Sequence, residues 1–451
     1  MTPAAVNPCA TTSAVAAVHA DFSVAAGKTA GATLVGCSGR ISEVEWTQLD
    51  GPAVELYTAR SQAITFDANE PGRYRFRADY KTASGTAGAI DVTITADAAS
   101  RPSALNARND QAVRSEGQFS IRAYWNLEAG DTVRRVEWTQ TAGPPAAKVD
   151  VTLPERLLVT APKVSSDTIL VFEATLTSAN GVVDRDQAIV IVEAFPQADP
   201  RDSSYTFATV HVDRVYPYRR GGKYEAVLVE CAYHPKLRFV AVGNSANTLC
   251  PVSKLPFLAQ EAADGVPTVD QIMARVAVSH DWMGARFEEY LRNGDSSLDI
   301  RRMLGAVTAI VLTSHTRPSF YRRGLAAIDI DAGVLWRTPA ERDTVGETLD
   351  ARANSSNELS YRRVSRYVTG GQNAFGDYPR QDRGVRSNAH LLASIEKDLY
   401  HELTHARDYF APIPQFFPAK SAWEHIFPLR EQKRLVSDQL HASAPLQSKI
   451  L

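Results

Sequence analysis

The sequence predicts a multidomain protein in which two all-β domains precede an α+β domain. Three observations indicate this order. The segment "VEWTQLDGP" at 44–52 returns as "VEWTQTAGP" at 136–144. Apolar and polar residues alternate after each copy, which is the pattern of strands with one buried face. Beyond about residue 200, segments with helical spacing are mixed with short apolar runs, and this mixture indicates an α+β domain.

Length and charge narrow the classes of function. The chain has 451 residues, which predicts two to four domains at roughly 150 residues each. Its net charge is −2, with 49 basic and 51 acidic residues. This balance gives no electrostatic reason to expect nucleic acid or an anionic membrane as a partner. No apolar run reaches the roughly 18 residues of a membrane helix, so we expect no transmembrane segment.

The four cysteines fall into two pairs, Cys9 with Cys37 and Cys231 with Cys250. Each pair lies inside one predicted domain, and no CxxC motif is present. We expect two local disulfides, and therefore an oxidising compartment, with buried free thiols as the alternative. The N-terminal stretch lacks the basic and apolar regions of an intact signal peptide. The expectation is a secreted, periplasmic or cell-surface protein whose signal peptide has been removed.

The repeat divides the N-terminal part into two domains, 1–97 and 98–195. Turn signals such as Pro71–Gly72 and Asn180–Gly181 interrupt the alternating runs at short intervals. Many short strands in about 90–100 residues are typical of a β-sandwich.

The residues of the first copy also carry a family resemblance. "VEWTQ…GP", then "F-x-A", then "G-x-Y-x-F" resembles the PKD-like and Ig-like modules of extracellular proteins. The second copy departs from this pattern at 168–170, where "TIL" replaces "GRY". The resemblance implies spacer or adhesive modules, and it makes a cell-surface or matrix component a candidate partner.

The third predicted domain covers 196–451 and follows a linker at 194–205 that is rich in Pro, Asp and Ser. The segment 268–292 is predicted to be one helix. Thr268 is a plausible N-cap of this helix, and Gly294 follows its end.

Two apolar runs, 306–314 and 325–336, are predicted to be strands. The sequence "TPAE" at 338–341 is a capping box with Pro339 at the first helical position. The arginine-rich run 361–388 has no sustained periodicity. We expect it to be a solvated loop rather than a clamp for an acidic substrate.

The next segment is predicted to be a long helix that begins at Ser387 or Asn388, continues to Phe410 and is ended by Pro412 and Pro414. Its apolar residues follow one another at steps of three or four, which makes one continuous stripe. The stripe contains Leu392, Ile395, Leu399, Leu403, Ala406 and Phe410.

The opposite side of this helix carries His401 and His405, one turn apart. Side chains at i and i+4 lie within roughly 6 Å of each other, so both imidazoles can reach one metal ion. Glu402 lies 100° round from His401 and can flank the metal without binding it. A carboxylate in that place can take a proton from a metal-activated water.

The pentapeptide "HELTH" resembles the H-E-x-x-H motif of the zincin metallopeptidases. The resemblance implies a zincin-like fold for 196–451 and a bound Zn²⁺ with His401 and His405 as ligands. It also implies that Glu402 is the general base and that the substrate is a peptide or protein.

The third zinc ligand is left open by the sequence. The metzincin extension is absent, because Asp408 and Ala411 occupy its glycine and histidine positions. Glu424 follows "HELTH" after 18 residues, a spacing that resembles the gluzincins and makes it the favoured ligand. Asp408 and Glu431 are the alternatives, and Asp408 is expected to orient a ligand histidine instead.

Two further parts of such a site are predicted less closely. The edge strand that would pair with a substrate is expected at 325–336, with 306–314 as the alternative. The donor to the oxyanion is left open among four residues, His425, His441, Tyr378 and Tyr361.

Two functions follow from these patterns. The favoured one is an exported zinc metallopeptidase that uses Glu402 as its general base. The alternative is a non-catalytic cell-surface or adhesion protein that retains a zincin-like metal-binding scaffold. Glu402 discriminates between them, because an inert metal-binding domain does not need it.

Overall fold

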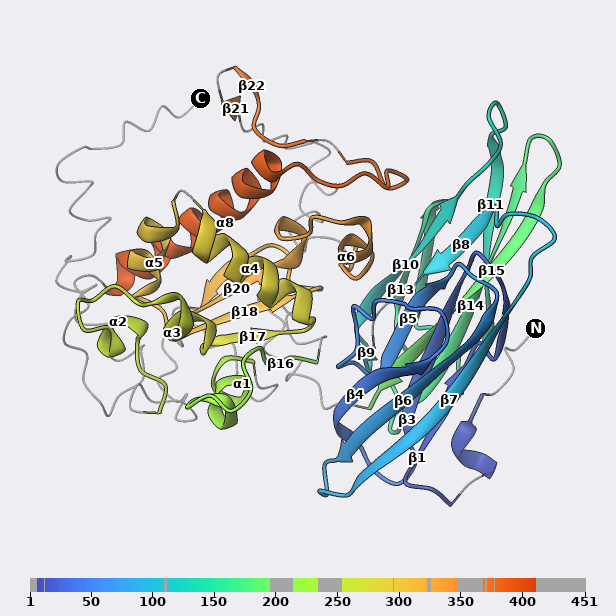
Figure 1. The fold of residues 1–451 in the computed structure, drawn as a ribbon, viewed down its shortest axis with the longest axis horizontal. Helices are drawn as coiled ribbons and strands as arrows, with labels where there is room; N and C mark the ends of the chain where they lie inside the picture. Colours follow the sequence, from blue (N-terminus) through green and yellow to red (C-terminus); the bar gives the residue numbers. More distant parts are fainter. Residues whose placement is uncertain are drawn as a thin grey trace.

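The computed structural model contains two β-sheet domains and a third domain that mixes strands with helices (Figure 1). The two β-sheet domains, coloured blue and cyan to green, lie side by side, and the third domain, yellow to red, lies next to them. The residues that the structure describes are 6–11, 13–108, 112–194, 214–233, 254–294, 296–322, 326–347, 368–369, 371–376 and 378–410.

The first domain is a sandwich of two sheets. One sheet contains, in order, β1 (Ala16–Ala20), β3 (Lys28–Gly36) and β5 (Ala63–Ala68). The other contains β2 (Ser23–Ala25), β7 (Ala87–Asp97), β6 (Gly72–Thr82) and β4 (Ile41–Asp50). The alternation of β6 buries Tyr74, Phe76 and Ala78 and exposes the residues between them. The buried residues of both sheets form one apolar core.

The second domain repeats this arrangement. One sheet contains β12 (Lys148–Leu153), β13 (Arg156–Thr160), β10 (Gln118–Trp125) and β8 (Leu105–Arg108). The other contains β11 (Val133–Ala142), β14 (Thr168–Ser178), β15 (Val183–Glu193) and β9 (Val113–Arg114). These pairings confirm the prediction of two β-sandwiches.

The repeated "WTQ" segment has the same role in both sandwiches. The Gln48 side chain accepts a hydrogen bond from the Val54 backbone (3.0 Å) and donates one to the Pro52 carbonyl (2.7 Å). Gln140 makes the two equivalent bonds in the second copy, at 3.0 and 2.7 Å. Each glutamine therefore holds the chain as it leaves the strand.

The glycine of each copy is required by its backbone. Gly51 has φ 102° and Gly143 has φ 89°, positive values that residues other than glycine rarely adopt. A Cβ at Gly51 would lie 2.2 Å from the Arg73 carbonyl oxygen, and one at Gly143 would lie 2.1 Å from that of Ile169. The local backbone geometry therefore requires the glycine in both copies of the repeat.

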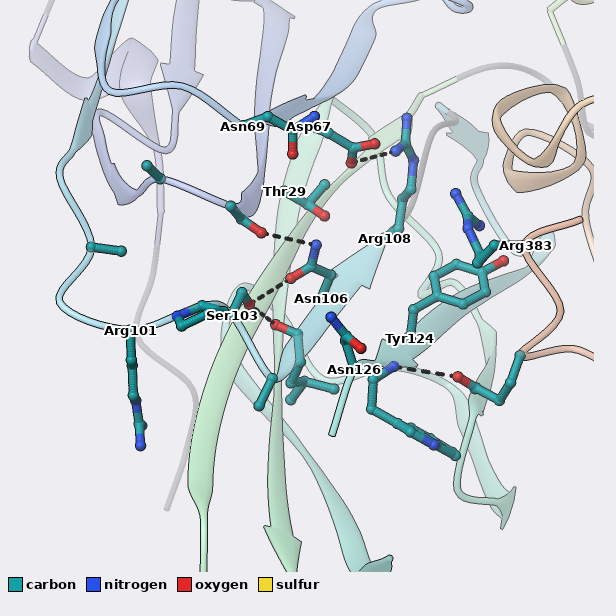
Figure 2. Close-up of a pocket in the computed structure, with 18 of the residues that line it drawn as sticks. Thr29, Asp67, Asn69, Arg101, Ser103, Asn106, Arg108, Tyr124, Asn126 and Arg383 are labelled. Carbon is teal, nitrogen blue, oxygen red and sulfur yellow. Dashed lines mark hydrogen bonds and ion pairs between the residues drawn. The ribbon is translucent and has the colours of Figure 1, made fainter. Parts of the chain in front are cut away.

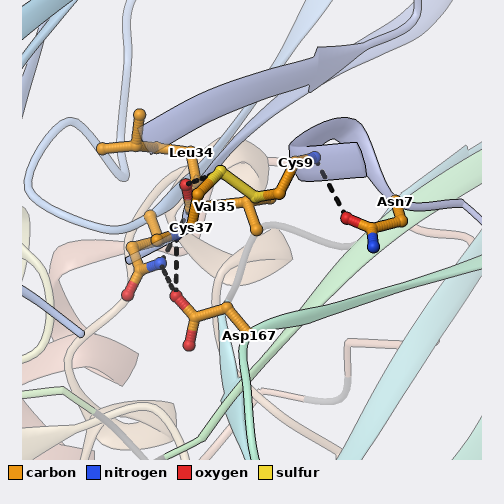
Figure 3. Close-up of a disulfide and its surroundings, with 8 residues drawn as sticks. Asn7, Cys9, Leu34, Val35, Cys37 and Asp167 are labelled. Carbon is orange, nitrogen blue, oxygen red and sulfur yellow. Dashed lines mark hydrogen bonds between the residues drawn. A yellow bond between two sulfur atoms is a disulfide. The ribbon is translucent and has the colours of Figure 1, made fainter. Parts of the chain in front are cut away.

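A disulfide fastens the N-terminal segment to the first sandwich (Figure 3). Cys9, in the 3-10 helix η1 (Pro8–Thr11), is bonded to Cys37, which follows β3. This confirms the predicted first pair. Cys231 is also disulfide-bonded, and its predicted partner Cys250 lies outside the described residues.

The two sandwiches are joined by both apolar and polar contacts. An apolar cluster contains Val35 of the first sandwich and Ile189 of the second. At one end Lys28 Nζ lies 2.8 Å from an Asp184 carboxylate oxygen. At the other end, Asp167 accepts hydrogen bonds from the Gly36 backbone (3.2 Å) and from the Gln62 side chain (2.8 Å). The relative orientation of the two modules is therefore set by side chains.

The third domain is built on a five-stranded sheet. Its order is β16 (Tyr216–Pro217), β17 (Val276–Val278), β18 (Ala309–Thr313), β20 (Ala327–Asp331) and β19 (Phe320–Arg322). The three central strands are parallel, and the two outer strands are antiparallel to their neighbours.

Seven helices are described in this domain: α1 (Glu225–Tyr233), α2 (Leu258–Glu261), α3 (Val269–Met273), α4 (Asp281–Asn293), α5 (Ser297–Leu304), α6 (Pro339–Asp343) and α8 (Asn388–Phe410). A 3-10 turn, η3 (Ala332–Val334), follows β20, and a small hairpin joins β21 (Val368–Thr369) to β22 (Gln372–Asn373). The capping box at Thr338 and Glu341 is confirmed at the start of α6.

The prediction of one helix over 268–292 is wrong. Thr268 does cap a helix, as expected, but that helix is α3 and it ends at Met273. Val276–Val278 then forms the fully buried strand β17 before α4 begins. β17 pairs with a strand on each edge and is buried on both faces. A segment without an exposed face does not show the periodicity of a helix with one buried face.

The predicted edge strands are also wrong. The strands inside 306–314 and 325–336 are β18 and β20, and both have neighbours on each side. The edges of this sheet are β16 and β19. The predicted linker, 194–205, lies outside the described residues apart from Ala194.

The two repeat tryptophans provide a matched test of burial. Trp46 is 3% exposed and donates from Nε1 to the Ser61 carbonyl (3.0 Å), whereas Trp138 is half-buried and its bond to Pro154 is 3.3 Å long. We expect Trp46→Ala to reduce the free energy of unfolding by about 3–5 kcal/mol, and Trp138→Ala to reduce it by less. Urea denaturation of both variants measures this, and equal losses would contradict it.

Two buried carboxyl groups between the sandwiches predict a pH dependence. Burial raises the pKa of Asp186 to about 8 and that of Asp21 to about 6. Both values exceed those of the unfolded chain, near 4, so at these two positions the folded protein binds more protons, and the stability that the two groups contribute falls as pH rises from about 4 to 8.

We expect Asp186→Asn to flatten this decline and to raise the midpoint of thermal unfolding at pH 8. The Asn amide oxygen can still accept the hydrogen bond that the Ala107 backbone gives Asp186. The difference between variant and parent at each pH isolates this group. A difference that does not change between pH 4 and pH 8 would refute the prediction.

Candidate metal site

Helix α8 is oriented by its buried stripe. Ile395, Leu399, Leu403 and Ala406 are at most 1% exposed and belong to the main core of the third domain. The Ser387 hydroxyl accepts a hydrogen bond from the His390 backbone (3.3 Å), so it caps the helix as predicted. The face opposite the stripe is therefore directed away from the core.

Two polar contacts that sequence reasoning missed also hold this helix. The Ser319 hydroxyl, beside β19, donates to the buried carboxylate of Asp398 (2.6 Å). Ser296, beside α5, donates to Glu396. In the sequence these contacts are marked by Glu396 and Asp398, two acidic residues near the apolar stripe. Their presence does not identify the serines that bind them.

The two predicted histidine ligands lie together on the outer face of α8. The ring centroids of His401 and His405 are 5.0 Å apart, with an angle of 84° between the ring planes. Both residues are exposed. Glu402 is only 5% exposed, and its Oε1 lies 3.8 Å from His401 Nε2.

This arrangement fits two of the ligands of a zinc ion. Nitrogen ligands lie about 2.0–2.1 Å from zinc in a tetrahedral site, which places the centroids of two bound imidazoles roughly 5 Å apart. The observed separation agrees with that value. An edge-to-face ring pair has the same spacing without a metal, so the distance permits zinc binding but does not require it.

The charges around His405 favour its ligand form. Partial burial and the neighbouring His401 lower the pKa of His405, and the carboxylate of Asp408 acts against them. Imidazole binds metal only when it is neutral, so a lowered pKa increases the fraction that can bind at neutral pH. The action of Asp408 on His405 also agrees with its predicted place beside a ligand.

The favoured third ligand lies outside the residues that the structure describes. No group of three or more His, Cys, Asp or Glu able to hold a metal ion occurs within them. Glu424 and Glu431 both lie outside the described residues, so the two histidines are one part of a predicted site.

Tyr378 does not lie beside the histidines of the motif. Its hydroxyl is 3.0 Å from His390 Nδ1, in the first turn of α8. The rise of a helix places His401 about 16 Å further along. The other three predicted donors, His425, His441 and Tyr361, are outside the described residues.

The arginine-rich run before α8 is largely an exposed loop where it is described, as expected, but several of its arginines are bound within the protein. Arg380 donates to Glu347 (2.9 Å), and Arg383 makes two bonds to Asp343 (2.7 and 2.9 Å). Arg386 stacks on Trp336, 4.0 Å from the ring centroid. These arginines hold the chain against the second sandwich and the core.

A large groove lies where the two sandwiches meet the third domain (Figure 2). It has a volume of about 1010 Å³. Its charges are largely paired within the protein: Arg108 lies 2.7 Å from Asp67, and Arg383 contacts Asp343. The groove therefore has little net charge to attract an ionic ligand.

Comparisons with solved structures find several proteins that resemble part of this chain. No protein-family model and no curated protein sequence matches the chain. The PKD domain from KIAA 1837 protein is 22% identical over 19% of this chain and 90% of its own, with a TM-score of 0.15. Fibronectin(III)-like modules of Clostridium thermocellum CbhA are 13% identical over 39% and 94% of the two chains, with a TM-score of 0.16. Murine CEACAM1b is 8% identical over 40% and 98%, with a TM-score of 0.15.

The assignment of the two sandwiches rests on the strand pairings described above.

No helix among the described residues combines the length and apolar character needed to cross a membrane.

Removal of one histidine tests the metal site directly. Loss of an outer-shell partner alone costs 10–100-fold in metal affinity, so we expect His405→Ala to weaken zinc binding by more than roughly 100-fold. His390→Ala, on the same helix, is the matched control and should retain the parent affinity. Competition with a chromophoric chelator measures both, and equal affinities of the two variants would contradict the site.

Proposed function

We propose that this protein is an exported zinc-dependent metallopeptidase that hydrolyses peptide bonds. One observation supports this most directly. His401 and His405 lie side by side on the outer face of a helix whose other face is buried, and the carboxylate of Glu402 lies next to them. A metal helix of the H-E-x-x-H type needs this division into a core face and a ligand face.

In this proposal His401 and His405 hold the zinc, with Glu424 as the favoured third ligand. The bound zinc supplies Lewis acidity to the peptide carbonyl and to water. Glu402 removes a proton from the water as its oxygen attacks the carbonyl carbon. The same carboxyl group then returns the proton to the amide nitrogen as the carbon–nitrogen bond breaks.

Glu402 differs from the two histidines in its burial. The structure gives the side chain 7% exposure, whereas that of its neighbour His401 is 67% exposed. Glu402 therefore lies at the boundary between the core and the ligand face.

Strand β19 is the proposed place for an extended substrate. It is an antiparallel edge of the sheet, and it contacts α8. An edge strand next to the metal helix can pair with a peptide through backbone hydrogen bonds. This replaces the two strands that the sequence favoured.

The N-terminal modules and the disulfides support an extracellular or periplasmic setting. Stable disulfides form in oxidising compartments, and Cys9–Cys37 is present. The proposed partner of the modules is a cell-surface or matrix component, which would hold the third domain near its substrate.

The alternative is a non-catalytic surface or adhesion protein with a retained metal scaffold. The exposure of both histidines favours it, since two solvated imidazoles on a helix need no function. The two hypotheses differ in whether Glu402 matters to anything beyond stability.

The test compares zinc content and proteolysis in the parent and three variants. Glu402→Gln should keep its zinc and lose about 100-fold or more in activity on a denatured protein, the lower range for a lost general base. Glu424→Ala should lose both zinc and activity. Glu289→Gln is the control for an exposed carboxylate in the same domain and should change neither.

Each outcome has a defined meaning. Undiminished proteolysis in Glu402→Gln would refute the mechanism. A normal zinc content in Glu424→Ala would refute the third ligand and direct attention to Asp408 or Glu431. Stoichiometric zinc without any proteolysis in the parent would favour the alternative.

A further inference from the structure

A second cavity, about 420 Å³ in volume, lies between the second sandwich and the third domain. Six arginines and one carboxylate, Glu347, line it together with apolar and small residues. The other two described cavities of this kind have balanced charges, with three basic and three acidic residues in one and four of each in the other. The six arginines are Arg122, Arg156, Arg317, Arg342, Arg380 and Arg386.

The sandwich contributes its arginines from adjacent strands. Arg108, Arg122 and Arg156 stand directly opposite one another on β8, β10 and β13. All three are buried, at 5%, 5% and 6% exposure. Like charges placed opposite each other across a sheet destabilise it. This row therefore needs anions to offset its repulsion.

The protein itself supplies only part of that negative charge. Arg108 faces Asp343 (3.7 Å), and Arg122 faces Glu347 (3.3 Å). Arg156 makes a single long hydrogen bond, 3.5 Å from Nη1 to the Glu347 carbonyl oxygen. Its Nε has no hydrogen-bond partner in the part of the chain that the structure describes. A guanidinium has five N–H donors, and the buried Nε of Arg156 is one that the described residues leave unsatisfied.

The third domain adds a buried cation from the other side. Arg386 is 8% exposed and donates to the carbonyl oxygens of Val334 (3.1 Å) and Gly333 (3.2 Å). Its pKa is lowered to about 10, chiefly by burial; Arg342 also lowers it, whereas Tyr378 and Asp331 act in the opposite direction.

We propose that this cavity binds a small molecule through a phosphate or sulfate group. Guanidinium groups bind such oxyanions through paired N–H donors, and charge-assisted bonds of this kind are strong. Arg317 is paired with Asp331 (3.1 Å) and Arg380 with Glu347 (2.9 Å). The cations that remain in excess are Arg156, Arg342 and Arg386, and a dianion offsets such an excess better than a monoanion does. The cavity volume falls within the usual range for small-molecule sites, so it leaves room for an organic part beside the anion.

The site is separate from the helix with the histidine pair. Trp336, Tyr378 and Arg386, which all precede α8, line the cavity, whereas His401 lies more than three turns into that helix. It thus stands whether or not the protein is a peptidase. Because it spans two domains, occupancy would add contacts between them.

The test is calorimetric titration of the full chain with inorganic phosphate, inorganic sulfate and acetate in chloride buffer at fixed ionic strength. We expect saturable binding of phosphate or sulfate, and the tighter of the two identifies the group. Arg156→Gln should weaken that binding roughly 10–100-fold, the loss typical of one charge-assisted interaction. Arg135→Gln, an exposed arginine of the same sandwich, should leave it unchanged.

A second measurement covers the case in which Arg156→Gln fails to fold. Arg386→Gln removes a cation from the opposite domain and should give the same loss. The bound anion should also raise the thermal midpoint of the parent and not that of either folded variant. Absence of saturable phosphate or sulfate binding in the parent would overturn the proposal. So would acetate binding of equal strength, or unchanged affinity in both variants.

Discussion

The burial of one face of α8 is the constraint on which the candidate site depends. Leu399 and Leu403 are almost fully enclosed, and each such side chain contributes about 1.5–3 kcal/mol when it leaves water. A rotation of the helix by one residue would expose them and break the bond between Ser319 and Asp398. The outward direction of His401 and His405 is therefore fixed by packing in the core. A metal would find its two nitrogen ligands already in place.

Charge has the corresponding role between domains. The second sandwich meets the third domain through a row of buried arginines, whose acidic partners there lie at the end of α6 (Asp343) and just after it (Glu347). Burial opposes ionisation of Asp343, yet Arg108 and Arg383 hold its pKa below the usual value. Tyr124 adds a hydrogen bond of 2.6 Å to the same carboxylate. Isolated charges at such depth would be costly, so each group depends on the others. The surplus of cations beyond this network is what makes the second cavity a binding site.

The sequence predicted what is local and missed what depends on neighbours. The sandwiches could be predicted because alternation over 72–82 and 168–178 is a property of each strand by itself. The caps at Thr268 and Ser387 could be predicted for the same reason. Strand order is not local: nothing in 306–314 reveals that it lies inside a sheet. The interruption of a helix by β17 likewise follows from pairing with β18, which overrides the periodicity of the segment.

The side-chain contacts between the two sandwiches have a mechanical consequence. Lys28 with Asp184, and Gln62 with Asp167, brace the pair at both ends of their shared apolar cluster. Arg60 continues the chain of contacts to Asp281 at the start of α4. Modules joined in this way behave as one rigid unit rather than as independently moving domains. If the N-terminal module is anchored, the distance over which the third domain can act is set by the length of this rigid unit, not by a flexible connecting peptide.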